Sequence, residues 1–349
     1  MREPSLKILI IGATPLGAYL AAHFTFLQQD YVWYTSPQIA ASVLDAGGIL
    51  ALGARGRRWA RGVRMVTSEA YHEAYDVVFM AMQGYAVADA LYEMMQHAPT
   101  LRGSATAFVA MQRGIGPYER IASVFGEKHT IRAALTTWIE HPTSAAPHIF
   151  VRMPSGGVAL AEGHPLSAEI AALLYAAYLP VLLGESREIG WSALLWQLQA
   201  NTMPALMDLD ADDVYRSPSL ATIEHAMLLE ALGIIQALGV RLIDLPGAPV
   251  RRLATQLQLY PPVLFAERGV RNPAPPSLRV ELEQGIDRSE AAYLNGAIAV
   301  NARDLELNAP INYVLALTLD DIANGRALWT QFRGNPRMLE AIINVATDR

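Results

Sequence analysis

Hydrophobic and polar positions divide the chain into two halves with different patterns. In the first half, short apolar runs of strand length alternate with stretches of helical spacing. The runs that predict strands cover residues 8–11, 31–35, 76–82, 105–111 and 179–183. The stretches that predict helices cover residues 18–24, 86–96 and 166–177. Strands separated by helices of this length indicate a mainly parallel sheet with right-handed crossovers.

From Ser186 onward the pattern becomes helical. The predicted helices cover residues 191–209, 219–238, 249–260, 278–284 and 288–303. Proline and glycine separate them, as in Leu245-Pro246-Gly247. The pattern therefore predicts an all-helical second domain, and we place its boundary after residue 184.

The first strand, Ile8 to Ile11, leads directly into a turn with glycine at both ends. Gly12 permits the tight turn, and Gly17 lets the following helix pack against the strand. This arrangement is typical of a Rossmann-type unit, in which a pyrophosphate binds at the helix N-terminus. Thr14 replaces the middle glycine, so it either shifts the turn or hydrogen-bonds a phosphate through its hydroxyl. The predicted cofactor loop comprises Gly12, Ala13, Thr14, Pro15, Leu16 and Gly17.

These patterns together predict an α/β fold. Residues 1–184 are expected to form an N-terminal Rossmann-type doubly wound parallel sheet, and residues 185–349 an all-helical C-terminal domain. Thr35 and Ser36 follow the second strand, where a dinucleotide places its adenosine ribose. Both offer only neutral hydrogen bonds, and no acidic residue ends the strand. We therefore expect NADP or NAD as cofactor, with weak discrimination between them.

Composition limits the partners. The net charge of −6 gives no reason to expect nucleic acid or an anionic membrane, and the absence of cysteine excludes thiol chemistry. No signal peptide precedes the first strand, and the apolar run 170–184 is too short to span a membrane. Four clustered aspartates lack the spacing of a calcium loop: Asp208, Asp210, Asp212 and Asp213. We expect a soluble cytoplasmic protein that binds a small molecule and has no metal site.

Four segments resemble, in their order and intervals, motifs of the ketopantoate reductase (2-dehydropantoate 2-reductase) family. Residues 111–116, Met-Gln-Arg-Gly-Ile-Gly, resemble its Leu-Gln-Asn-Gly-Leu-Gly turn. Residues 195–201 resemble its Trp-x-Lys-Leu-x-x-Asn helix, and Ser277 resembles the serine that opens its last motif. Residues 288–296 resemble that motif, Arg-x-Thr-Glu-Ile-Asp-x-Leu-Asn-Gly. The resemblance covers nearly the whole chain.

The resemblance implies a Rossmann domain and a helical domain with the active site between them, where NAD(P)H reduces a carbonyl group. Matched by position, the catalytic candidates are Arg113, Gln197, Asn201, Ser277 and Glu290. Gln83 joins the cofactor candidates because a lysine of the family stands at its position. The apolar helices of the second half also favour a homodimer.

The chain departs from the family at several positions of these motifs, and most of the residues replaced are charged in the family. Gln197 stands where a lysine acts as general acid toward the keto oxygen, and Arg113 stands where the family has asparagine. Thr35 replaces an arginine that pairs with a 2′-phosphate. The only lysines of the chain, Lys7 and Lys128, lie elsewhere. Because glutamine delivers no proton at neutral pH, this loss implies a rate lower by about 10²–10⁴-fold.

Two hypotheses follow. In the first, the protein is an NAD(P)H-dependent reductase of a carbonyl or imine other than ketopantoate. Arg113 then binds a carboxylate, Glu290 orients a substrate hydroxyl or amine, and Asn201 and Ser277 hydrogen-bond the substrate. A surface salt bridge for Arg113 and helix caps for Asn201 and Ser277 are the alternatives. In the second, the fold has been repurposed as a non-redox enzyme or a binding protein that has lost hydride transfer.

Overall fold

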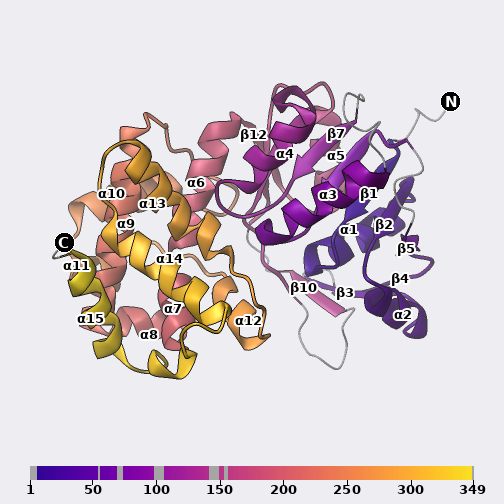
Figure 1. Ribbon diagram of the computed structural model, residues 1–349. Coiled ribbons are helices and arrows are strands. Elements are labelled where there is room, and N and C mark those ends of the chain that lie inside the picture. The colour runs from indigo at the N-terminus through magenta and orange to yellow at the C-terminus, as the bar shows by residue number, and fades with distance from the viewer. Residues whose placement is uncertain are drawn as a thin grey trace. The chain divides into compact units, whose positions relative to one another are not determined.

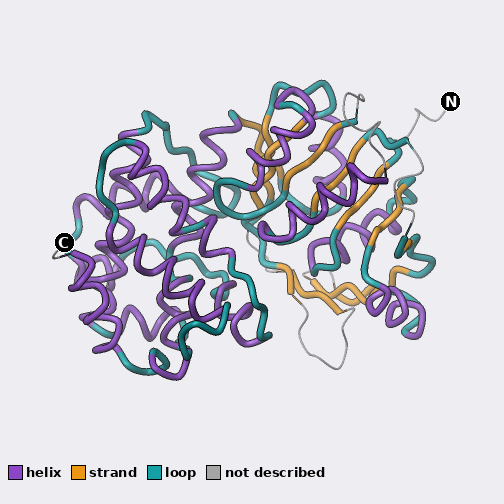
Figure 2. Tube along the Cα trace, in the orientation of Figure 1, coloured by secondary structure: helices purple, strands orange, loops and turns teal. Residues whose placement is uncertain are grey.

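The chain folds into two compact units. A computed structural model describes residues 6–53, 56–68, 74–97, 106–140, 149–152 and 156–347. Unit 1 comprises residues 1–112, 117–189 and 245–247, and unit 2 comprises residues 113–116, 190–244 and 248–349. Strands gather in unit 1, whereas unit 2 consists of helices and loops in its described part (Figure 2).

Unit 1 is built on an eight-stranded sheet with the order β12-β11-β8-β7-β6-β1-β2-β5. Figure 1 labels β12, β7, β1, β2 and β5 of this sheet. Its strands are β1 (Ile8–Ile11), β2 (Tyr31–Tyr34), β5 (Met65–Val66), β6 (Val77–Met80), β7 (Ala107–Ala110), β8 (Thr130–Leu135), β11 (Val158–Ala161) and β12 (Val181–Gly184). All neighbouring strands pair in parallel except β8 and β11, which pair antiparallel. The mainly parallel sheet that the sequence predicts is confirmed.

Helices cover both faces of this sheet because successive residues of a strand point to opposite faces. Ile8 and Ile10 of β1 belong to one hydrophobic core with α1 and α5, and Leu9 and Ile11 belong to another with α3 and α4. The helices of unit 1 are α1 (Pro15–Phe26), α2 (Pro37–Asp45), α3 (Val87–His97), α4 (Pro117–Phe125) and α5 (Ser167–Ala176), with the 3₁₀ turns η1 (Gly84–Ala86) and η3 (Glu127–His129). The doubly wound architecture is thus confirmed.

A second sheet in unit 1 differs from the prediction of a single sheet. Its order is β4-β3-β10-β9, with β3 (Ile49–Gly53), β4 (Gly56–Ala60), β9 (Ile139–Glu140) and β10 (Ile149–Arg152). Strands β3 and β4 form an antiparallel hairpin. Because four of the five residues of β4 are exposed, the strand carries no alternation of apolar and polar positions that would predict it.

Unit 2 contains the helices that follow residue 189, and α6 begins just before it. They are α6 (Ser186–Leu198), α7 (Thr202–Met207), α8 (Ala211–Arg216), α9 (Pro218–Ala237), α10 (Val250–Leu259), α11 (Pro262–Arg268), α12 (Ser277–Glu283), α13 (Asn295–Asp304), α14 (Pro310–Ala323) and α15 (Pro336–Thr347), with the 3₁₀ turns η4 (Glu290–Tyr293) and η5 (Trp329–Gln331). Helix α9 contacts α8, α10, α11, α13 and α14. It is long and apolar enough to cross a membrane, but 61% of its apolar window is buried, as in the core helix of a globular protein.

Two long helices expected from the sequence are each interrupted, and both interruptions shape the candidate site. The predicted helix 191–209 breaks between α6 and α7, where Ala200 adopts a positive φ of 50°. A buried carboxylate, Glu224, holds this break by accepting a hydrogen bond from the Ala200 amide at 2.5 Å. The predicted helix 288–303 divides into η4 and α13 because Leu294, with φ −100° and ψ −98°, leaves the helical conformation.

Candidate functional site

The turn between β1 and α1 has the close packing that its two glycines predict. Gly12 has a φ of 141°, and a Cβ there would lie 2.3 Å from the Ala81 carbonyl oxygen. A Cβ on Gly17 would lie 2.3 Å from the Gly12 carbonyl oxygen. That oxygen also accepts a hydrogen bond of 2.9 Å from the Trp33 indole of β2. Only glycine therefore fits at either end of the turn.

Thr14 caps α1 and is fully engaged within the protein. Its Oγ1 accepts a hydrogen bond from the Gly17 amide at 3.1 Å and donates one to the Ala81 carbonyl at 2.5 Å. Because the one proton of this hydroxyl is used by Ala81, the structure favours the alternative in which Thr14 shapes the turn, and the hydrogen bond to a phosphate stays a prediction. Pro15, at the first helical position, has no N–H, so the amides left for an anion in this turn are those of Ala13, Thr14 and Leu16.

At the end of β2, the two predicted ribose contacts differ in their surroundings. The Thr35 hydroxyl is buried and has no hydrogen-bond partner. Ser36 caps α2, because its Oγ accepts a hydrogen bond from the Ile39 amide at 3.3 Å. An unsatisfied buried hydroxyl is costly, and a ribose hydroxyl bound beside Thr35 would satisfy it.

Gln83 lies half-buried after β6, at the cap position of η1, and forms no side-chain cap there. The next strand end contributes Gln112, which the sequence reasoning did not assign to the site. Its Nε2 donates to the Met80 carbonyl at 2.6 Å, while its buried Oε1 has no partner. The strand ends of unit 1 therefore fit a dinucleotide through backbone amides and neutral side chains.

The five predicted catalytic residues all belong to unit 2, which includes the short segment 113–116. Gly114 has a φ of 75°, and a Cβ there would lie 2.0 Å from the Tyr293 carbonyl oxygen of η4. The same oxygen accepts a hydrogen bond from the Ile115 amide at 2.9 Å. The turn that carries Arg113 is thus fixed against η4, the element that carries Glu290.

Gln197, at the end of α6, is oriented by this turn. Its side-chain oxygen accepts a hydrogen bond from the Gly114 amide at 3.1 Å. A backbone N–H needs an acceptor, so this contact orients the Gln197 side-chain amide with its oxygen toward Gly114. The side-chain NH₂ then points away and can donate a hydrogen bond to another group. Gln197 can therefore donate a hydrogen bond to a ligand, although it cannot deliver a proton.

Arg113 and Glu290 form an ion pair, with 3.4 Å between Arg113 Nη1 and Glu290 Oε2. The two side chains differ in exposure: 35% of the Arg113 side chain is accessible but only 3% of the Glu290 side chain. The alternative of a simple surface salt bridge for Arg113 does not fit, because its partner is buried. An arginine held by a buried carboxylate with part of its surface accessible suits a carboxylate ligand.

A second buried carboxyl group, Glu281 of α12, completes what we call the carboxylate cluster: Arg113, Glu281, Ser289 and Glu290. Glu281 Oε2 accepts a hydrogen bond from the Glu290 amide at 3.1 Å, and Ser289 also hydrogen-bonds its side chain. Burial and the nearby charge of Glu290 raise the pKa of Glu281 well above its usual value, although Arg113 opposes the shift. Sequence reasoning missed Glu281, whose only signal is its position one helical turn after Ser277.

Asn201 is hydrogen-bonded to Ser277 and to the backbone at the start of α12. Asn201 Nδ2 donates to the Gln197 carbonyl and to Ser277 Oγ, both at 3.2 Å. Its Oδ1 accepts a hydrogen bond from the Leu278 amide at 3.1 Å. Since the amide group of Asn201 has partners for its oxygen and both hydrogens, the cap interpretation fits this residue better than direct binding of a substrate.

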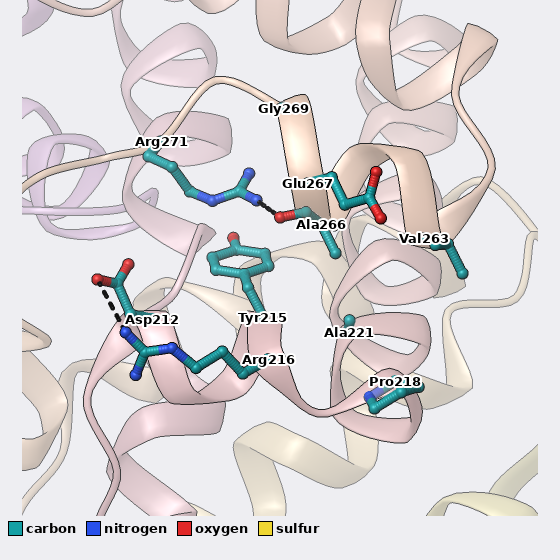
Figure 3. Close-up of a pocket in the computed structure, with 10 residues that line it drawn as sticks. All are labelled: Asp212, Tyr215, Arg216, Pro218, Ala221, Val263, Ala266, Glu267, Gly269 and Arg271. Atoms are coloured by element: carbon teal, nitrogen blue, oxygen red, sulfur yellow. Dashed lines mark hydrogen bonds and ion pairs between the residues drawn. The ribbon is translucent and has the colours of Figure 1, made fainter.

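The structure also contains a pocket of about 530 Å³ in unit 2, away from these residues (Figure 3). Its lining includes Tyr215, Arg216 and Arg271 but no predicted site residue. Arg216 pairs with Asp212, and Arg271 stacks on the Tyr215 ring and donates to the Ala266 carbonyl. Within the described residues, no cluster of three or more histidine, aspartate or glutamate residues could hold a metal ion.

Comparison with known proteins shows which fold the chain shares. The chain shares its fold with ketopantoate reductases and with a D-mandelate dehydrogenase whose structure contains NADH. Residues 185–323 match the family "Ketopantoate reductase PanE/ApbA C terminal", which confirms the resemblance over most of the helical half. No curated protein sequence matches the chain.

Three solved structures illustrate the similarity of fold. A PanE/ApbA family ketopantoate reductase from Ralstonia eutropha JMP134 has a TM-score of 0.76 at 19% identity, covering 92% of this chain and 99% of the other. D-mandelate dehydrogenase with NADH and anilino(oxo)acetate has a TM-score of 0.73 at 15% identity, covering 92% and 99%. A 2-dehydropantoate 2-reductase from Geobacter metallireducens GS-15 has a TM-score of 0.73 at 18% identity, covering 91% and 100%.

Proposed function

We propose that this protein is an NAD(P)H-dependent reductase of a 2-oxo acid, or of the corresponding imine, other than ketopantoate. The shared fold supports a nicotinamide cofactor, and the strand ends of unit 1 supply backbone amides and hydroxyls for it. The choice of a carboxylate substrate rests on Arg113, because its guanidinium is partly accessible and is held by the buried Glu290.

The substrate carboxylate would bind Arg113, and the carbonyl oxygen or imine nitrogen would accept a hydrogen bond from the Gln197 side-chain NH₂. A guanidinium binds a carboxylate through two parallel hydrogen bonds, which fixes its orientation. The ligand of the D-mandelate dehydrogenase structure, anilino(oxo)acetate, also combines an oxo group with a carboxylate. When bound, the cofactor would supply the hydride.

The test has two stages. Purified protein is first titrated with NADPH and with NADH while the fluorescence of the nicotinamide is followed. Consumption of the bound cofactor is then measured with aromatic and aliphatic 2-oxo acids, with cyclic imines and with ketopantoate. We expect binding of both cofactors with affinities within about 100-fold, or roughly 2.7 kcal/mol, because Thr35 and Ser36 carry no charge. Fast reduction of ketopantoate would contradict the proposal. Failure to reduce any of these compounds would contradict it as well.

A non-redox function is the second candidate, and the β1–α1 turn favours it. Thr14 occupies the place of the middle glycine and binds the Gly17 amide, while Pro15 removes another N–H. Both features reduce the number of amides that a pyrophosphate can reach. If neither cofactor changes its fluorescence at millimolar concentration, this second candidate replaces the first.

A further inference from the structure

The pocket of about 530 Å³ in unit 2 lies where α8, α9 and α11 contact one another. Helix α9 lines it with Pro218 and Ala221, and α11 lines it with Val263 and Ala266. These four residues form its apolar wall. A cavity of this size with an apolar wall and a few charged groups is typical of a site for a small molecule.

The guanidinium of Arg271, which also lines this pocket, is held in one orientation. Its Cζ lies 3.6 Å from the centre of the Tyr215 ring, and Figure 3 shows it directed to the Ala266 carbonyl. Nη2 donates to the carbonyls of Phe265, at 3.0 Å, and Ala266, and Nη1 lies 3.4 Å from the Val270 carbonyl. Among the described residues, no group accepts a hydrogen bond from its Nε–H and no carboxylate forms an ion pair with it. Arg271 can therefore bind an anionic group of a ligand.

The carboxyl group that acts on Arg271 from inside the fold is Glu224 of α9. Glu224 is fully buried, and burial raises its pKa to about 7, although the charge of Arg271 and the hydroxyl of Tyr215 oppose the shift. Glu224 is therefore partly protonated at neutral pH. It balances the positive charge of Arg271 only in part.

The other charged residues that line the pocket are Asp212, Arg216 and Glu267. Arg216 is paired, because it lies 4.0 Å from Asp212 and 2.6 Å from Asp213. Glu267, an exposed residue of α11, forms no ion pair within the part of the chain that the structure describes, and so does not pair with Arg271. The lining thus offers one guanidinium and one carboxylate, each able to take a ligand group of opposite charge.

We propose that this pocket is a second ligand site, which binds an α-amino acid with an apolar side chain in its zwitterionic form. Arg271 binds the carboxylate, Glu267 binds the ammonium group, and the side chain lies against the apolar wall. Exposed ion pairs contribute little alone, so the apolar contact supplies affinity and the two charges supply selectivity. The proposal does not rest on the reductase function, because no lining residue is a candidate for catalysis or cofactor binding.

The first experiment tests the class of ligand. The whole protein at pH 7 is titrated in a calorimeter with phenylalanine and with leucine. Two further probes each lack one charge: 3-phenylpropionate has no ammonium group, and 2-phenylethylamine has no carboxylate. We expect the amino acids to bind, and each single-charge probe to bind about 10-fold more weakly than phenylalanine or worse, because it leaves one charged residue without a partner. Binding of neither amino acid, or equal binding of either single-charge probe, overturns the proposal.

The second experiment places the ligand. Arg271→Gln and Glu267→Gln should each raise Kd for phenylalanine by about 10-fold or more. Arg268→Gln, at an exposed position of α11 that does not line the pocket, is the matched control and should keep the Kd of the wild type. Arg271 also caps α11, whereas Glu267 holds no other charged group, so Glu267→Gln decides the question even if Arg271→Gln fails to fold.

Arg113→Lys separates this pocket from the candidate catalytic residues. We expect it to leave the binding of phenylalanine unchanged, because Arg113 does not line the pocket. If Arg113→Lys weakens binding while Glu267→Gln and Arg271→Gln do not, the amino acid binds beside Glu290 instead. That result overturns the second site and leaves the reductase function standing. A failure of the reductase assays leaves the second site standing if the calorimetric results are as expected.

Discussion

The backbone amide of Gly114 donates a hydrogen bond of 3.1 Å to the side-chain oxygen of Gln197. A lysine at position 197 would place an ammonium donor against this N–H donor. We therefore expect Gln197→Lys to lower the free energy of unfolding by about 1 kcal/mol and to give no gain in ketopantoate reduction. Urea unfolding and NADPH consumption with ketopantoate measure the two effects. This result would indicate a site built around glutamine, rather than one that has decayed from lysine.

Gln197→Glu is the matched control for this prediction. It keeps an oxygen for the Gly114 amide but removes the side-chain NH₂ that would donate to the substrate. Its stability should stay near that of the wild type, while its rate with a 2-oxo acid falls. A marked rise in ketopantoate turnover on Gln197→Lys would show that Gln197 is only a lost lysine.

Arg113→Lys tests the binding of a substrate carboxylate. Lysine keeps the positive charge beside Glu290 but lacks the planar fork that binds a carboxylate at two points. We expect KM for a 2-oxo acid to rise about 10-fold, or roughly 1.4 kcal/mol, with a smaller change in kcat. Arg303→Lys, at an exposed position of α13, is the control. If KM stays constant in both variants, Arg113 does not bind the carboxylate.

The architecture was predictable because its signals are local. The apolar run before Gly12 and the alternation of strands and helices predict a doubly wound sheet, and the structure has one. The second sheet lacked such a signal because four of the five residues of β4 are exposed. The break after α6 was missed for another reason: Glu224, distant in sequence, holds the Ala200 amide there.

The candidate site was only partly predictable for the same reason. Sequence motifs brought out Arg113 and Glu290, which the structure pairs. They could not show that the side chain of Asn201 is hydrogen-bonded to Ser277 and to the Leu278 amide. Nor could they show that Glu281 accepts a hydrogen bond from the Glu290 amide. Those relationships depend on how α12 and η4 pack, which a pattern of single residues does not encode.

Thr14 gives a prediction about cofactor affinity. Thr14→Gly removes the hydrogen bond to Ala81 and frees the Gly17 amide for a phosphate. We expect tighter binding of NADPH together with a free energy of unfolding lower by about 1 kcal/mol. Thr14→Ser retains both hydrogen bonds and should match the wild type in the fluorescence titration and in urea unfolding. Weaker binding of NADPH by Thr14→Gly would mean that the threonine itself contacts the cofactor.

Glu224 makes the stability of unit 2 depend on pH. Its carboxyl group is fully buried, one oxygen accepts a hydrogen bond from the Ala200 amide, and the Tyr215 hydroxyl and Arg271 also act on the group. Burial raises the pKa of Glu224 to about 7 from its usual 4.5, despite the opposing hydrogen bond from Ala200 and the charge of Arg271. The folded protein therefore holds this proton more tightly than the unfolded chain does. The resulting stabilisation is complete below pH 4.5 and is lost as the pH rises to about 7.

The expected loss is about 3 kcal/mol, because each unit of pKa shift corresponds to about 1.4 kcal/mol. Glu224→Gln keeps an oxygen for the Ala200 amide and carries no charge at any pH. Its free energy of unfolding, measured in urea, should therefore fall less than that of the wild type between pH 5 and pH 8. Glu283→Gln, at an exposed position of α12, should follow the wild type. Equal slopes for Glu224→Gln and the wild type would mean that Glu224 is ionised in the folded protein across this range.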